Sequence, residues 1–182
     1  MSSDACARTG SAASEESLWP RYLLSDFPDA EDLEKYEPGG FHPVHLGDTY
    51  DDRYKIIHKL GSGGFSTVWL ARDILEDTWV ALKIVVAESS STVETKSHMV
   101  RDTLAKGGQS PRFAIHSRLF YIQGPDGHHL CVVLPVLGLS ALRLSHWIES
   151  RIRPRLCRMI AYQAAKGVCE LDSQSLCHGG KP

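Results

Sequence analysis

The fold is decided by residues 60–83, which read LGSGGFSTVWLARDILEDTWVALK. Glycines open this stretch and β-branched and aromatic residues follow them, which predicts a strand, a glycine-rich turn and a second strand. Residues 79–86 form an almost continuous apolar run, which predicts a central strand buried on both faces. Side chains alternate along a strand, so Ala81 and Lys83 share one face. Glycine N–H groups that can approach a phosphate therefore lie near an ammonium group.

Two other phosphate-binding loops do not fit this stretch. A dinucleotide-binding fingerprint needs a helix directly after its glycines, whereas STVWLAR, residues 66–72, favours a strand. A Walker loop ends in Gly-Lys-Ser/Thr, which is absent here. The order of Gly61, Gly63 and Val68, followed by VALK at 80–83, is typical of the glycine loop and lysine strand of protein kinases.

The flanking sequence predicts a mixed α+β fold. Strands are expected over 53–60, 66–72 and 79–86, and a hairpin pairs 118–123 with 129–136 around the turn residues 124–127. A helix is expected over 92–106, ended by Gly107 and Gly108. Further helices are expected over 140–149 and, from its apolar spacing, over 154–173. The result is a five-stranded antiparallel sheet with one helix, followed by further helices.

Composition limits the classes of function. The 182 residues carry a net charge of −2, which gives no general affinity for nucleic acid or membranes. The five cysteines are odd in number and form no CxxC pair, so reduced thiols in cytoplasm or nucleus are expected rather than disulfides or zinc. The sequence contains no run of about 18 apolar residues, so no membrane span is predicted.

The longer stretch YEPGGFHPVHLGDTYDDRYKIIHKLGSGGFSTVWLARD, residues 36–73, resembles the entry to the SR-protein kinase family. That family shares the Gly-Gly-aromatic-His-Pro-Val segment, the Gly-Asp pair and the Phe-Ser-Thr-Val-Trp of the loop. Ser66, where many kinases have a third glycine, therefore matches the subfamily. Residues 129–138, HLCVVLPVLG, resemble the fifth strand and hinge. The resemblance implies an ATP-binding serine/threonine protein kinase domain that transfers a phosphoryl group to protein Ser/Thr.

The resemblance also implies roles for single residues. Leu134 would be the gatekeeper behind the adenine, Pro135 would offer its carbonyl and Leu137 its N–H to the base. Pro135 replaces the usual acidic residue but keeps the carbonyl. The residues expected to bind ATP are Leu60, Gly61, Ser62, Gly63, Gly64, Phe65, Ser66, Val68, Ala81, Lys83, Leu134, Pro135 and Leu137.

Two positions depart from the family pattern. The glutamate that orients the lysine would fall near Ser97, so Glu94, one turn earlier, is the candidate for this role. His178-Gly179 matches the start of the catalytic loop, with Gly180 in place of the catalytic aspartate. Alternatively, Lys181-Pro182 matches the Lys-Pro that follows this aspartate, with one residue lost between. In either alignment the catalytic aspartate is absent. His178 is therefore expected to be a remnant, and the Mg²⁺ ligands that the family uses are not expected in this chain.

The expected organisation is a disordered tail at 1–30, an extended lead-in at 31–52, the kinase N-lobe with its hinge at 53–138, and a truncated C-lobe start at 139–182. Truncated in this way, the chain is expected to be inactive alone. By resemblance its partners are ATP, Mg²⁺ and protein substrates such as Arg-Ser-rich splicing factors. The alternative is a non-catalytic, pseudokinase-like fragment that binds a nucleotide or a partner protein.

Overall fold

The computed structural model describes residues 32–106, 110–138, 140–141 and 153–176. The predictions for residues 1–30, for Gly107 and Gly108, for nearly all of the helix at 140–149 and for His178 lie outside these residues. The elements are η1 (Leu33–Lys35), β1 (Thr49–Tyr50), β2 (Tyr54–Gly63), β3 (Ser66–Asp73), β4 (Thr78–Val85), η2 (Ala87–Ser89), α1 (Ser90–Lys106), β5 (Arg118–Gly124), β6 (Gly127–Pro135) and α3 (Pro154–Ser173).

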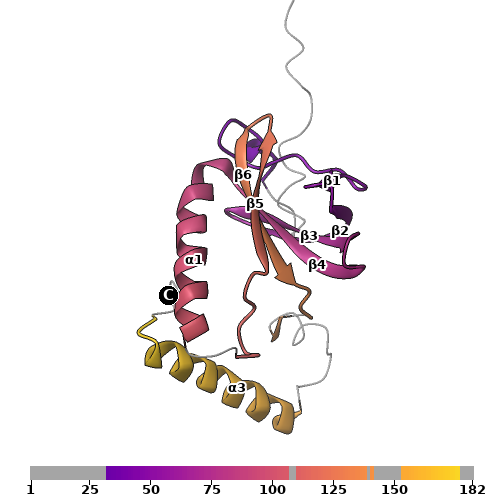
Figure 1. Ribbon diagram of the computed structural model, residues 1–182. Coiled ribbons are helices and arrows are strands. Elements are labelled where there is room, and N and C mark those ends of the chain that lie inside the picture. The colour runs from indigo at the N-terminus through magenta and orange to yellow at the C-terminus, as the bar shows by residue number, and fades with distance from the viewer. Residues whose placement is uncertain (1–31, 107–109, 139, 142–152, 177–182) are drawn as a thin grey trace, which may run out of the picture. The chain divides into compact units, whose positions relative to one another are not determined.

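The strands form one antiparallel sheet in the order β1-β2-β3-β4-β6-β5 (Figure 1). The predicted α+β class is confirmed, and β4 is central, as its apolar run predicted. The sheet has six described strands rather than the predicted five. The additional one, β1, pairs Thr49 with Lys55 and Tyr50 with Tyr54. A strand of two residues is too short to show alternation, so no sequence pattern predicts it.

The glycine-rich stretch is mostly strand and not loop. β2 was predicted to end at Leu60 but continues to Gly63, because Gly61 and Gly63 pair with Val68 and Ser66 on β3. Only Gly64 and Phe65 form the turn. Glycine has a low strand propensity, and pairing with β3 overrides it here.

The sheet curls so that its two ends meet. Asp51, beside β1, and Arg118 on β5 form an ion pair at 2.5 Å, although β1 and β5 are opposite ends of the strand order. The rings of Tyr54 and Phe120 stack with centroids 5.5 Å apart. The curl encloses the main core, which contains Tyr54, Ile56, Trp69, Ala71, Leu82, Ile84, Cys131 and Val133. This burial of large apolar side chains is the dominant favourable term in the fold.

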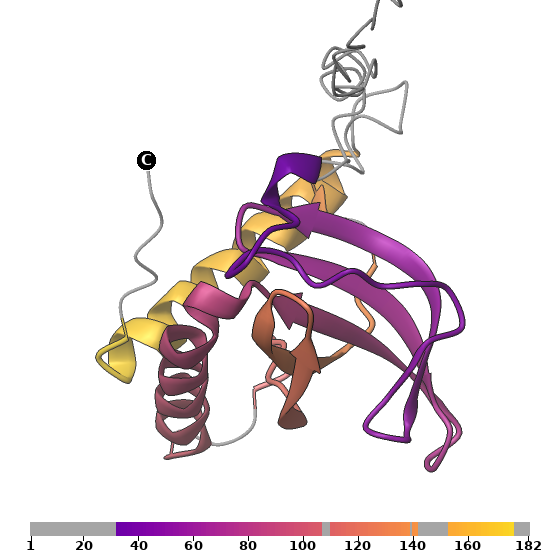
Figure 2. The same cartoon turned by 90° about the horizontal axis from the view of Figure 1, so that it is seen from above.

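The other side of the sheet carries α1. Val93 of α1 packs against a smaller core of Val85, Leu130 and Val132. In both views of the ribbon α1 runs beside the strand pair β5–β6 (Figures 1 and 2). The helix begins at Ser90, where the buried hydroxyl donates to the carbonyl of Val86 at 3.0 Å and accepts from the N–H of Leu130 at 2.9 Å. Ser90 therefore fixes the start of α1 to β6.

Gly39 and Gly40, in the segment before β1, form backbone hydrogen bonds with the β5–β6 turn and with η2. The N–H of Gly39 donates to the carbonyl of Asp126 in the β5–β6 turn at 2.7 Å. The N–H groups of Ala87 and Glu88 in η2 donate to the carbonyls of Gly40 and Gly39 at 3.1 and 3.0 Å. This glycine pair thereby ties η2, which precedes α1, to the tip of the β5–β6 hairpin.

Two buried histidines lie under this segment. The rings of His42 and His129 have centroids 5.0 Å apart. Nδ1–H of His129 donates to the carbonyl of Val85 at 3.1 Å, since a carbonyl can only accept. Burial, reinforced by His129, lowers the pKa of His42 to about 4, and burial lowers the pKa of His129. Both rings are therefore neutral at neutral pH.

We expect the fold to lose stability as the pH falls from about 7 to about 4. The pKa of His42 is lowered in the folded chain, so the unfolded chain binds the extra proton first. The stability contribution of a neutral His42 is present above pH 6.5 and is lost as the pH falls toward 4. One pKa unit corresponds to about 1.4 kcal/mol, so lowering the pKa of His42 from 6.5 to about 4 gives an expected loss of about 3 kcal/mol by pH 4. Urea unfolding at a series of pH values measures it.

The matched control is the exposed neighbour His45. A His45→Asn variant should keep the pH dependence, whereas His42→Asn should make it shallower between pH 6.5 and 4 and leave the part that His129 contributes. An equal slope in the two variants would show that His42 does not carry the effect.

Candidate nucleotide-binding site

Strand register places four of the predicted ATP-binding residues on one face of the sheet. Val68 of β3 lies opposite Lys83 of β4, and Ala81 lies opposite Leu134 of β6. Directly opposite residues point to the same face, and so do residues two apart on one strand. Val68, Ala81, Lys83 and Leu134 therefore form two neighbouring rows on a common surface, as the alternation along β4 predicted for Ala81 and Lys83.

The glycine hairpin adjoins this surface. Gly61 lies opposite Val68, Ser62 lies opposite Thr67, and Leu60 falls at the irregularity in register between Lys59 and Gly61. Ser66 pairs with Gly63 and with Val85 and is buried. Phe65 at the tip is 64% exposed, and its carbonyl accepts from the N–H of Val86 at 3.0 Å. The ring is thus free to cover a ligand while its backbone is held.

The glycines of the hairpin are not required by the packing of the chain. A Cβ added at Gly61, Gly63 or Gly64 would meet no atom within 4 Å. A Cβ added at Gly124, by contrast, would collide with the ring of His42. Open space over three glycines suits the close approach of an anion to backbone N–H groups, so the hairpin fits the phosphates of a nucleotide.

The hinge residues follow β6. Leu134 is half-buried, and Pro135, the last residue of the strand, lies opposite Val80. Leu137 is 68% exposed just beyond it. Their backbones are therefore at the edge of the face that carries Ala81, where the resemblance placed the contacts to a base.

Behind Lys83 lies a cavity of about 470 Å³ between the sheet and α1. Lys83, Val132 and Leu134 line it from the sheet, and Val93, Ser97 and Val100 are among the residues that line it from α1. Sequence reasoning missed Val132, although its spacing of two from Leu134 on one strand was a usable signal. It also missed Lys96 and Arg101 of α1, which line the same cavity.

The structure does not bring Glu94 to Lys83. Its carboxylate accepts a hydrogen bond from the hydroxyl of Tyr121 on β5 at 2.8 Å, and burial together with this carboxylate raises the pKa of Tyr121. Glu94 is not among the residues that line the cavity with Lys83, although its helix neighbours Val93 and Ser97 are. Ser97, near which the resemblance placed the family's glutamate, is among the residues that line the cavity with Lys83. Within the described residues Lys83 has no ion pair.

Neither a metal-binding cluster nor a membrane-spanning helix is found in the described part of the chain. No group of three or more His, Cys, Asp or Glu side chains gathers there in an arrangement that could hold a metal ion. The described helices include none that combines the length and apolarity needed to cross a bilayer.

Comparison with known proteins identifies relatives of one kind, although no protein-family model matches the chain. The chain is 38% identical over 131 residues to SRSF protein kinase 3 of Homo sapiens, covering 69% of this chain and 23% of the relative. It is 40% identical over 126 residues to serine/threonine-protein kinase SRPK of Physarum polycephalum, covering 65% of this chain and 29% of the relative. It is 36% identical over 135 residues to serine/threonine-protein kinase SKY1 of Saccharomyces cerevisiae, which covers 69% of this chain and 18% of the relative. The chain thus spans less than a third of the length of these relatives.

Proposed function

Because the chain belongs by homology to the SR-protein kinase family of serine/threonine kinases, we propose that residues 53–138 form the ATP-binding lobe of such a kinase domain. The observation that carries the proposal is the common face of Val68, Ala81, Lys83 and Leu134, next to a glycine hairpin with open space over it. In the protein of which this lobe is part, the activity is phosphoryl transfer from ATP to Ser or Thr of a protein.

Each group on this face has a defined task in the proposal. Val68, Ala81 and Leu134 offer apolar surface to the adenine, and the small side chain of Ala81 leaves room for it. The N–H groups of the hairpin and the ammonium of Lys83 hold the phosphates through charge-assisted hydrogen bonds. Mg²⁺ neutralises phosphate charge when bound, and we assign none of its ligands to the described residues.

The substrate class follows from the relatives and not from this lobe. One relative is named for SRSF proteins, and we propose Arg-Ser-rich splicing factors as the protein substrates of the whole enzyme. We propose that the enzyme acts in the cytoplasm, the nucleus or both.

A second candidate is a non-catalytic module that binds a nucleotide or a partner protein. It is favoured by the surroundings of Lys83, where Ser97 replaces the expected glutamate and Glu94 is bonded to Tyr121. A turnover assay with Mg-ATP and an Arg-Ser peptide separates the two candidates. Activity of the 182-residue chain that Lys83→Met abolishes would support catalysis, and binding without turnover would support the second candidate.

ATP is expected to stabilise the chain through Lys83 and the hairpin. At a hundredfold excess over its Kd, a ligand that binds only the folded state adds about 2.7 kcal/mol to the free energy of unfolding. We expect Lys83→Met to weaken ATP binding by roughly tenfold or more, because it removes one charge-assisted hydrogen bond. We expect a similar loss for Gly63→Ala, because its Cβ would keep a phosphate from approaching the backbone N–H groups. Thermal unfolding with and without ATP measures both variants.

Gly63→Ala also tests whether the glycine serves the ligand or the fold. Since no atom lies within 4 Å of the added Cβ, the stability without ATP should change by less than about 1 kcal/mol. A variant that loses stability but keeps the ATP effect would contradict the proposal.

A further inference from the structure

The cavity behind Lys83 has a mostly apolar wall that is held in place by polar contacts. Phe113 and Ile115 line it on one side and Leu171 of α3 on another. Arg112 donates from Nε to the side-chain oxygen of Gln163 on α3 at 3.1 Å and forms an ion pair with Glu170. The segment beside Phe113 is therefore fixed to α3. At about 470 Å³ the cavity falls within the range of small-molecule sites.

The charged groups of this cavity are all basic. Lys83 comes from β4, and Lys96 and Arg101 come from α1. Among the described residues that line the cavity there is no Asp or Glu. Glu94, the acidic residue of α1 nearest in sequence to Lys96, is bonded to Tyr121. The cavity thus gathers positive charge without a carboxylate to balance it, which favours an anion.

His116 adds a polar group to the same wall. It is only 7% exposed and lines the cavity, and its Nε2 has no hydrogen-bond partner among the described residues. Burial, with Arg101 and then His98, lowers the pKa of His116, so the ring is neutral at neutral pH. A buried polar atom without a partner is costly, and a bound ligand would remove that cost.

We propose that this cavity binds a small amphipathic carboxylate, with its apolar body against Val100, Leu104 and Phe113 and its carboxylate among Lys83, Lys96 and Arg101. The ligand would thus supply from outside the negative charge that α1 does not bring to Lys83. The cavity shares Lys83 and Leu134 with the proposed nucleotide site, whereas Lys96, Arg101 and His116 are not among the residues assigned to the nucleotide. Variants of Lys96 and Arg101 therefore test this proposal separately from ATP binding.

The probe is 2-naphthoate, and the matched control ligand is 2-naphthamide, which has the same rings without the charge. Titration calorimetry on the 182-residue chain measures both. We expect naphthoate to bind and the neutral amide to bind at least about tenfold more weakly, as for the loss of a charge-assisted hydrogen bond. Equal affinity for the two ligands, or no binding of naphthoate, would overturn the proposal.

Variants locate the site. Lys96→Gln combined with Arg101→Gln should weaken naphthoate binding by roughly tenfold, because both side chains line the cavity. Both residues are exposed, so the fold should persist, and Arg158→Gln on the exposed surface of α3 should bind like the parent chain. Ser97→Phe, which fills the cavity, should abolish binding. Unchanged binding in the double variant would overturn the proposal even if ATP binding is intact, and loss of ATP binding alone would leave it standing.

Discussion

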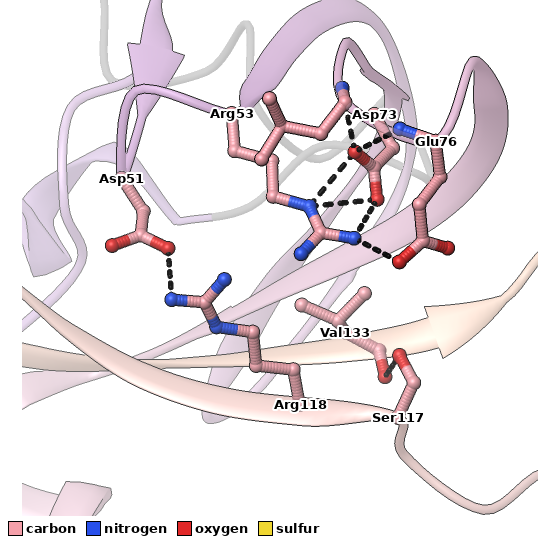
Figure 3. Close-up of polar contacts among 8 residues, drawn as sticks. Asp51, Arg53, Asp73, Glu76, Ser117, Arg118 and Val133 are labelled. Carbon is pink, nitrogen blue, oxygen red and sulfur yellow. Dashed lines mark hydrogen bonds and ion pairs between the residues drawn. The ribbon is translucent and has the colours of Figure 1, made fainter.

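Asp73→Ala is expected to lower the free energy of unfolding by about 3–5 kcal/mol, because it leaves a largely buried arginine without its main partner. Asp73 is 2% exposed and accepts from Nε of Arg53 at 2.8 Å and from Nη2 at 2.7 Å (Figure 3). It also accepts from the N–H groups of Leu75 and Glu76 at 3.1 and 3.2 Å. Hydrogen bonds from Arg53 lower the pKa of Asp73, so the carboxylate is ionised at neutral pH. The carboxylate of Asp73 therefore accepts hydrogen bonds both from Arg53, just before β2, and from backbone N–H groups of the β3–β4 turn.

The control for Asp73→Ala is a substitution of Glu76, which is the other ion-pair partner of Arg53. Glu76 forms an ion pair with Nη2 of Arg53 at 2.5 Å, but its side chain is 65% exposed. Exposed ion pairs contribute roughly 0–1 kcal/mol, so Glu76→Ala should cost less than about 1 kcal/mol. Urea unfolding of the two variants gives the comparison. Similar losses for both would show that burial of Asp73 does not make the difference.

Local periodicity accounts for what the sequence could predict. The apolar run of β4, the turn residues between β5 and β6 and the helical spacing of α3 each depend on near neighbours, and each element forms close to the expected bounds. The face shared by Ala81 and Lys83 follows from alternation alone. The position of Leu134 opposite Ala81 depends on the pairing of β4 with β6, which joins segments about fifty residues apart and which local spacing does not predict.

Contacts between residues far apart in the chain account for the rest. The stacking of Tyr54 on Phe120 and the pair of Asp51 with Arg118 depend on the curl of the whole sheet. The rotation of α1 about its axis is set by Val93 packing on β6, so whether Glu94 would face Lys83 could not be read from its spacing. A helix wheel gives relative directions only, and a tertiary contact is needed to orient it.

The glycines of this chain divide into two groups with different tasks. Gly61, Gly63 and Gly64 have open space where a Cβ would be, so their lack of a side chain serves something other than the packing of the chain. Gly40 and Gly124 have no such space. From the sequence alone, all of these glycines are expected in turns. Only the three-dimensional structure distinguishes the glycines that leave room for a ligand from those that the packing requires.

Gly40→Ala is the sharpest test of that division and should cost about 3 kcal/mol, at the upper end of the usual range for overpacking. Its Cβ would overlap the carbonyl oxygen of Lys35 and lie 3.0 Å from that of Glu37, and both are backbone atoms that a side-chain rotation cannot move. The carbonyl of Gly40 also accepts from the N–H of Ala87, so the strain should reach η2 and the start of α1. Urea unfolding measures the loss, and faster hydrogen exchange at the amide of Ala87 shows where it acts.

Gly61→Ala is the matched control, because it makes the same chemical change where no atom lies within 4 Å. Its stability should stay within about 1 kcal/mol of the parent chain. If the two variants were equally stable and exchange at Ala87 were unchanged, the segment around Gly40 would not hold η2 in place. If Gly40→Ala behaves as expected, the position of α1, and with it the cavity behind Lys83, depends on a contact that lies more than forty residues earlier in the chain than Lys83.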